Sequence, residues 1–104
     1  MKSICFIGIH KDELQRIPDD DELKALSHKV GNCAVQLGVE LGLNMVDIEA
    51  SLYRYPKSIF KQTFDVLKKW SHSRKEVKPT MCILMRAMLK SDPRGFWFLK
   101  NKDT

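Results

Sequence analysis

Cysteine, proline and glycine are scarce in this chain of 104 residues, and they follow no regular spacing. Because the three cysteines (Cys5, Cys33 and Cys82) are odd in number, a disulfide framework is not expected. Each should act as a small apolar side chain in a reducing compartment, the cytoplasm. The glycines form no phosphate-binding loop, and no Gly- or Pro-rich linker divides the chain, so we expect one domain.

Long apolar runs are also absent. The most apolar stretch, residues 4–9, stops at a charged sequence and is too short for a signal-peptide core or a membrane span. We therefore expect no membrane partner. The stretch is nevertheless too apolar for a solvated tail, so we expect it to pack against Phe96, Trp97 and Phe98. Three consecutive aromatic residues cannot all face one side of a helix, and at least one is exposed unless something covers it.

The polar residues lack the patterns that catalysis or metal binding requires. His10, His28 and His72 show no ligand spacing with cysteines or carboxylates, whereas structural zinc needs four closely spaced ligands. Ser71 and Ser73 flank His72, but sequence neighbours seldom point at each other, and no acid partner is evident. We therefore expect no enzyme activity, no metal or cofactor and no small-molecule substrate.

Charge is distributed unevenly along the chain. Residues 1–52 carry five Lys or Arg and nine Asp or Glu, which gives −4. Residues 53–104 carry thirteen and four, which gives +9. Such asymmetry favours either an anionic partner for the second half or head-to-tail contacts between copies and relatives. An uneven solvated surface would give the same counts, so charge alone does not decide.

Apolar residues recur at helical spacing, and start and stop signals divide the chain into six short helices. The first begins at the acidic run of residues 19–22, whose charge suits a helix N-terminus, and it ends at Gly31. The second extends from Ala34 to Leu41, and Gly42 stands past its end as a C-cap.

The other four helices have similar signals. The third begins at Asn44 and breaks before Pro56, because a residue before proline avoids the helical region. The fourth, from about Lys57 to Trp70, is apolar over a wide arc and should be central. Pro79 fits the first turn of the fifth helix, and Asp92-Pro93 opens the last. The pattern predicts an all-α bundle.

Several weak motifs, in order, resemble those of the death-domain family. Residues 37–44 resemble the Leu-Ala-x-x-Leu-Gly-Leu-Ser signature of its second helix, and residues 47–49 resemble the Asp-Ile-x that opens its third. Residues 54–56 look like its Tyr-Pro or His-Pro turn. Gln62 and the Leu-x-x-Trp of residues 67–70 match the fourth helix, and residues 79–88 resemble Ala-Thr-x-x-x-Leu-x-x-Ala-Leu of the fifth.

The resemblance implies a six-helix antiparallel bundle of the death-fold, Greek-key type over residues 19–100, with an N-terminal extension (1–18) and a tail (101–104). It implies a homotypic protein–protein interaction module that catalyses nothing. Such modules assemble signalling oligomers in apoptotic or innate-immune pathways, as adaptors for caspase or kinase recruitment. The implied partners are other death-domain proteins, either itself or relatives.

The spacing from Pro56 to Trp70 looks most like RAIDD-type caspase adaptors, and FADD-type adaptors are similar. Three positions depart from the family pattern: Ala34 stands where Trp is frequent, and Gly38 and Pro79 each replace an Ala.

An acidic surface on one copy would meet a basic surface on the next, which can build rings or helical stacks. The candidate interface residues are Asp19, Asp20, Asp21, Glu22, Asp47, Glu49, Arg54, Lys57, Lys61, Lys68, Lys69, Arg74, Lys75 and Lys78. The expected core residues are Leu23, Leu26, Leu37, Leu41, Leu43, Ile48, Leu52, Phe64, Leu67, Trp70, Leu84 and Met88.

The alternative is a small basic helical nucleic-acid-binding domain, because lysines and arginines bracket Trp70 in the +9 half. A solvated basic face is the commoner meaning of such a run, so nucleic acid is not the expected partner.

Overall fold

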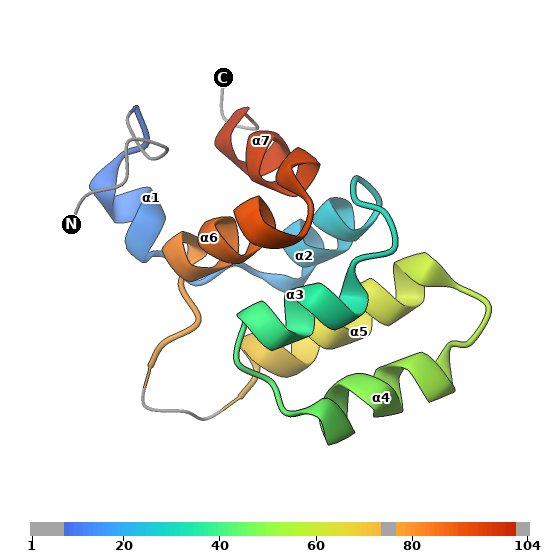
Figure 1. The fold of residues 1–104 in the computed structure, drawn as a ribbon. Coiled ribbons are helices and arrows are strands. Elements are labelled where there is room, and N and C mark those ends of the chain that lie inside the picture. The colour runs from blue at the N-terminus through green and yellow to red at the C-terminus, as the bar shows by residue number, and fades with distance from the viewer. Residues whose placement is uncertain (1–7, 74–76, 102–104) are drawn as a thin grey trace.

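Seven α-helices and no strands form the regular structure of residues 8–73 and 77–101, the part of the chain that the computed structural model describes (Figure 1). The prediction of an all-α fold is confirmed. The radius of gyration is 13.0 Å, close to the value of about 13 Å expected for a compact domain of this length. The helices are α1 (Lys11–Gln15), α2 (Asp20–Ser27), α3 (Ala34–Glu40), α4 (Met45–Arg54), α5 (Ile59–Ser71), α6 (Met81–Ser91) and α7 (Pro93–Asn101).

Helix α1 was not predicted, because it lies within the expected N-terminal extension. The six predicted helices correspond in order to α2–α7. With five residues and none fully buried, α1 is too short to show an apolar period. His10 caps it by accepting a hydrogen bond from the backbone N–H of Asp12. The helix packs against α6, and the N–H of Met81 donates to the carbonyl of Arg16 at 2.7 Å.

Polar side chains fix the N-terminal ends of the predicted helices. At α2, the Asp19 side chain accepts from the backbone N–H of Glu22, and the Glu22 side chain accepts from that of Asp19. This reciprocal pair is a capping box. The Asn44 side chain accepts from the backbone N–H of Asp47 at the start of α4, and α7 begins at Pro93, both where predicted.

Three predicted helix boundaries are wrong. Lys57 lies outside α5 because Ser58 is its N-cap, and Pro79 lies outside α6 because Thr80 is its N-cap. In both cases a hydroxyl accepts a backbone N–H of the first turn, which satisfies a donor that the helix leaves unpaired. Helix α2 ends at Ser27, well before Gly31.

Gly42 ends α3 as predicted, with a φ of 86° that favours glycine. The N–H of Leu43 donates to the carbonyl of Gly38, and the N–H of Gly42 donates to that of Val39, both at 3.0 Å. These two bonds form a Schellman motif. The motif turns Leu43 back against the core cluster and sets the direction of α4.

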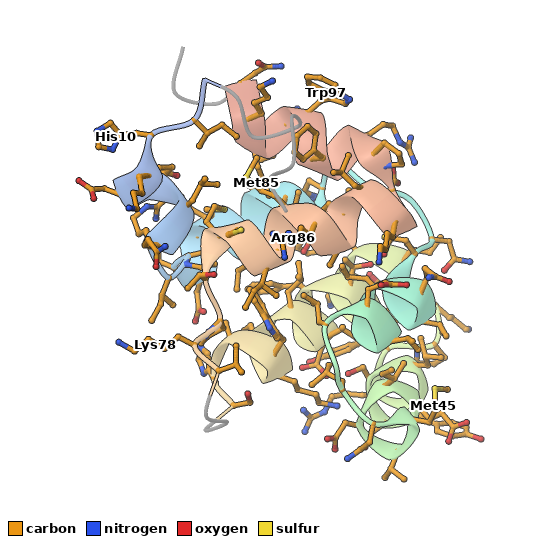
Figure 2. All side chains as sticks on the ribbon, turned by 60° about the vertical axis from the view of Figure 1, so that its left-hand side comes forward. His10, Met45, Lys78, Met85, Arg86 and Trp97 are labelled. Atoms are coloured by element: carbon orange, nitrogen blue, oxygen red, sulfur yellow. The ribbon has the colours of Figure 1, made fainter. Side chains whose placement is uncertain are left out.

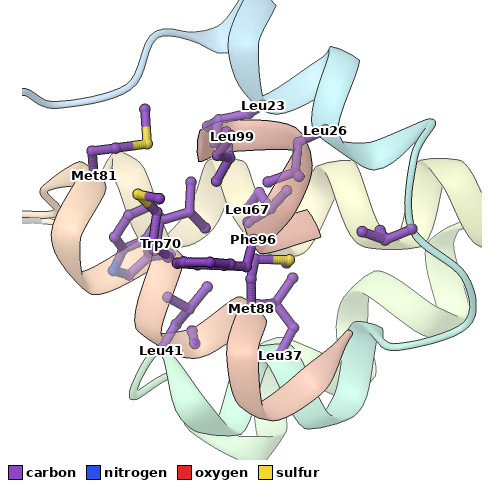
Figure 3. Packing of buried hydrophobic residues seen from close by; sticks show 14 of the residues in the cluster. Leu23, Leu26, Leu37, Leu41, Leu67, Trp70, Met81, Met88, Phe96 and Leu99 are labelled. Atoms are coloured by element: carbon purple, nitrogen blue, oxygen red, sulfur yellow. The ribbon is translucent and has the colours of Figure 1, made fainter. Parts of the chain in front are cut away.

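Helices α3, α5 and α6 each pack against three others: α3 against α4, α5 and α6, α5 against α2, α3 and α4, and α6 against α1, α3 and α7 (Figure 1). Phe96 is fully buried in the middle of the hydrophobic cluster (Figure 3). Most predicted core residues are buried: Leu23, Leu26, Leu37, Leu41, Ile48, Leu67, Trp70, Leu84 and Met88. The prediction is corrected for Leu43, Leu52 and Phe64, which are only half-buried.

The expected packing of residues 4–9 can be followed only in part, because residues 4–7 lie outside the described residues. Ile9 is half-buried and packs against the core cluster. Of the three consecutive aromatic residues, Phe96 is buried, Phe98 is half-buried and Trp97 is 52 % exposed. At least one aromatic side chain is therefore exposed, as the sequence pattern indicated.

Candidate protein-interaction surfaces

The acidic run at the start of α2 is engaged within the chain. Both carboxylate oxygens of Glu22 accept hydrogen bonds from Arg16, each at 2.6 Å. The carboxylate of Asp20 lies 3.1 Å from Nε2 of His72 at the end of α5. Asp21 is exposed. Glu22 and Asp20 thus connect α2 to α1 and to α5, whereas Asp19, Asp20 and Asp21 stay exposed, as expected for an acidic surface.

Helix α4 presents an outward stripe of apolar and acidic side chains. Val46, Glu49, Ala50 and Tyr53 recur at helical spacing and are all exposed, Val46 to 75 % and Tyr53 to 84 %. We call these four residues the α4 face. Asp47, which is also exposed, lies at its edge. Two of the predicted acidic interface residues therefore do share one open surface, and apolar side chains accompany them.

Three lysines converge on a groove of about 280 Å³ between α2 and α5. Lys24 reaches it from α2, whereas Lys61 and Lys68 reach it from α5. The ammonium of Lys61 lies 5.9 Å from the ring centroid of Tyr55, and that of Lys68 lies 4.7 Å from the ring centroid of Phe64. Cation–π attraction of this kind holds the ammonium groups along the rim. We call this site the α2–α5 groove.

Aromatic rings form the floor of the α2–α5 groove. The imidazole of His28 stacks on Phe60 with centroids 3.8 Å apart, and the centroids of Phe60 and Phe64 are 6.0 Å apart. Phe64, which was expected in the core, therefore lines a surface site together with Phe60. A cationic rim over an aromatic floor suits a partner segment that is both acidic and apolar.

Asp65 is the one acidic residue in the lining of the α2–α5 groove, and its carboxylate has partners within the chain. It accepts a hydrogen bond from the Ser51 hydroxyl at 2.7 Å, and Nζ of Lys69 lies 3.5 Å away. Lys69 also donates to the carbonyl of Asp47 at 2.7 Å. Lys68 and Lys69 are thus divided: Lys68 faces the groove, whereas Lys69, only 29 % exposed, joins α4 to α5.

Three other predicted basic residues lie apart from the groove. Arg54, Lys57 and Lys78 are exposed but do not line it. Arg74 and Lys75 lie outside the described residues. The sequence patterns missed Lys24, although Lys24 and His28 share one face of α2 at i and i+4, as Phe60 and Phe64 do on α5. That these two faces meet depends on the packing of α2 against α5.

Two buried titratable groups, Cys33 and Asp92, have structural roles. Burial raises the pKa of the Cys33 thiol to about 11, so Cys33 stays protonated and acts as an apolar side chain. Asp92 accepts hydrogen bonds from the Arg94 guanidinium and from the N–H of Gly31. These hydrogen bonds, that of Arg94 foremost, lower the pKa of Asp92 to about 2. The carboxylate thereby ties the turn after α2 to the start of α7.

Within residues 8–73 and 77–101, no group of three or more His, Cys, Asp or Glu side chains is placed to hold a metal ion. None of the helices described is both long and apolar enough to cross a membrane. No protein-family model matches the chain, and no curated protein sequence is significantly similar to it.

Proposed function

We propose that the chain is a homotypic interaction domain of the death-fold type, which assembles signalling oligomers with copies of itself or with related domains. In the proposed contact, the α4 face of one copy docks into the α2–α5 groove of the next. The observation that carries this proposal is the complementarity of two exposed surfaces on one chain. Glu49 lies between apolar side chains on the first, and three lysines surround an aromatic floor on the second.

The arrangement of the helices favours contact between molecules. Helices α2 and α4 both pack against α5, but the α4 face points to solvent, away from α5. A domain therefore cannot place its own α4 face in its own groove. Because each copy carries one surface of each kind, the contact is heterologous and can repeat into a ring or a helical stack.

The order of the helices also supports the death-fold assignment. Helices α2–α7 follow one another as the family motifs imply, with the turn at Gly42 and the start at Pro93 in their expected places. In this proposal α2–α7 form the six-helix antiparallel Greek-key bundle, and α1 is an addition to it. A role as adaptor for caspase or kinase recruitment, in apoptotic or innate-immune signalling, follows from the resemblance alone.

The test is self-association measured by sedimentation equilibrium over a range of protein concentrations. The parent should form oligomers as concentration rises, and Lys61→Glu/Lys68→Glu should weaken association at least about tenfold, because like charges would then face Glu49 of the next copy. Lys29→Glu/Lys100→Glu is the matched control. It makes the same change in net charge on the outer side of the molecule near α7, and it should associate like the parent.

Two outcomes contradict the proposal. One is equal weakening in both double variants, which would reflect net charge alone. The other is a parent that stays monomeric at all concentrations and binds random duplex RNA with steep salt dependence, which is typical of a nucleic-acid-binding domain.

A further inference from the structure

The outward face of α7 carries cations and aromatic rings that the proposed assembly contact does not use. Arg94, Trp97, Phe98 and Asn101 recur at i, i+3, i+4 and i+7, and they line one shallow depression together with Lys29 from the turn after α2. We call these residues, together with Lys100, the α7 face. It lies at the end of the molecule opposite α4 (Figures 1 and 2).

Trp97 is the projecting residue of the α7 face. Its side chain is 52 % exposed and points away from the body of the molecule (Figure 2). The buried ring of Phe96 meets the Trp97 ring edge to face, with centroids 5.0 Å apart and planes at 82°. The core thus fixes the position of an exposed indole.

Ammonium groups accompany the aromatic rings of this face. Nζ of Lys100 lies 5.0 Å from the centroid of Trp97, and Nζ of Lys29 lies 5.7 Å from that of Phe98. Helix α7 itself contains no Asp or Glu. Arg94 is neutralised by Asp92 at 2.7 Å, which leaves Lys29 and Lys100 as the cations that can meet an external anion.

We infer that the α7 face docks on the surface of a membrane that contains anionic lipids. Trp prefers the headgroup level of a bilayer, where its ring is partly buried and its N–H stays wet. Lys29 and Lys100, at the level of the rings, would meet lipid phosphates and carboxylates there. The outward side of an outermost helix is convex, so it can contact a flat surface without rearrangement (Figure 1).

Other anionic partners fit this face less well. Stacking of nucleic-acid bases needs an open ring face, whereas Lys100 lies over the Trp97 ring and Phe96 abuts it. Among the described residues, the α4 face is the acidic and apolar surface that a second copy could offer, and the proposed assembly contact already occupies it. The expectation of no membrane partner rested on the absence of a long apolar run. A helix that lies on a membrane needs no spanning length, so this docking revises that expectation.

One domain offers a single exposed indole and two lysines on this face, so its contact with a membrane should be weak. If copies assemble as proposed above, an oligomer presents many such faces, and avidity strengthens the contact. The α7 face is separate from both assembly surfaces, and membrane docking is tested on dilute protein that has not assembled.

The test uses vesicles of phosphatidylcholine with phosphatidylserine, and vesicles of phosphatidylcholine alone, at low ionic strength. The parent should co-sediment with the anionic vesicles only, and added salt should release it. Trp97 emission should shift to the blue and be quenched by brominated lipid, whereas the buried Trp70 should contribute a constant background. Adsorption without quenching would overturn the inference, because the indole would then remain in water.

Two variants locate the contact. Lys29→Glu/Lys100→Glu should lower the partition coefficient at least about tenfold, and Trp97→Ala should also weaken co-sedimentation while circular dichroism shows an intact fold. Lys57→Glu/Lys78→Glu is the matched control, since it changes net charge equally at exposed lysines that belong to neither the α7 face nor the α2–α5 groove, and it should bind vesicles like the parent. The inference would be overturned if the control lost as much binding as Lys29→Glu/Lys100→Glu, or if the parent did not bind anionic vesicles. Neither result bears on assembly, which is measured without lipid.

Discussion

The guanidinium group of Arg16 donates to both carboxylate oxygens of Glu22, with N···O distances of 2.6 Å for each bond. It also donates to both oxygens of Glu13, at 3.0 and 2.6 Å. Its backbone carbonyl accepts the N–H of Met81. One residue thus joins α1, α2 and α6, and bidentate charge-assisted bonds of this kind are among the stronger ones in proteins.

Replacing this guanidinium should loosen α1. Arg16→Met keeps the apolar stem but removes every side-chain hydrogen bond, so we expect the free energy of unfolding to fall by about 1 kcal/mol, since the pair is partly solvated. Urea denaturation gives that value, and amide exchange at Leu14 should accelerate. Glu13→Gln should have a smaller effect because Glu22 remains bonded. Parent-like stability and exchange in Arg16→Met would show that α1 is held by other contacts.

Asp92 should make the stability of the folded protein depend on pH. Its pKa is about 2 in the folded protein against 3.8 for an ordinary Asp. Because the folded-state value is the lower one, the contribution is complete above a pH of about 4 and is lost as the pH falls towards 2. The shift corresponds to about 2 kcal/mol. Asp92→Asn should therefore lower stability at neutral pH and flatten the fall of unfolding free energy between these pH values. A slope identical to the parent would contradict this assignment.

The hydroxyl of Thr63 is buried without a hydrogen-bond partner among the described residues. Thr63→Val replaces it with a methyl group of similar size, so denaturation should show a gain of about 1 kcal/mol. Ser51→Ala makes a useful contrast, because it removes the hydroxyl that donates to the buried Asp65 and should destabilise by about 1–3 kcal/mol. A loss of stability in Thr63→Val would mean that its hydroxyl has a partner.

Gly38 allows α3 to approach α4 closely. A Cβ atom at this position would lie 2.7 Å from both Cδ1 and Cγ1 of the fully buried Ile48. Gly38→Ala gains about 1 kcal/mol of helix propensity, but overpacking of this kind typically costs about 1–3 kcal/mol, so we expect a net loss. Ile48→Ala removes both Cγ1 and Cδ1, so the added cost of Gly38→Ala should be smaller in the double mutant. Additive effects in that double-mutant cycle would exclude the steric explanation.

Local patterns predicted most of the fold. The apolar periods and the signals at Asn44, Gly42 and Pro93 are properties of neighbouring residues, and the structure confirms them. Helix α1 was not predicted, because it is held by the tertiary hydrogen bonds of Arg16 and has no apolar stripe. Pro79 suggested a start for α6, but the hydroxyl of Thr80 satisfies the first turn instead.

The candidate surfaces were harder to predict, because they depend on which helices meet. Lys68 and Lys69 are adjacent in sequence and equal in charge, yet one faces the α2–α5 groove and the other binds Asp47. Lys24 joins the groove only because α2 packs against α5. The acidic run of residues 19–22 was expected to be open, but part of it binds Arg16 and His72 in the folded chain.

Complementation between two defective variants tests head-to-tail assembly most directly. Lys61→Glu/Lys68→Glu disrupts the α2–α5 groove but leaves the α4 face intact, whereas Glu49→Ala/Tyr53→Ala disrupts the α4 face but leaves the groove intact. Each variant alone should be monomeric by sedimentation equilibrium at concentrations where the parent assembles. Their mixture should form a one-to-one dimer and nothing larger, because only one intact pair of surfaces remains. A mixture that stays monomeric, or a single variant that still assembles like the parent, would contradict the proposed contact.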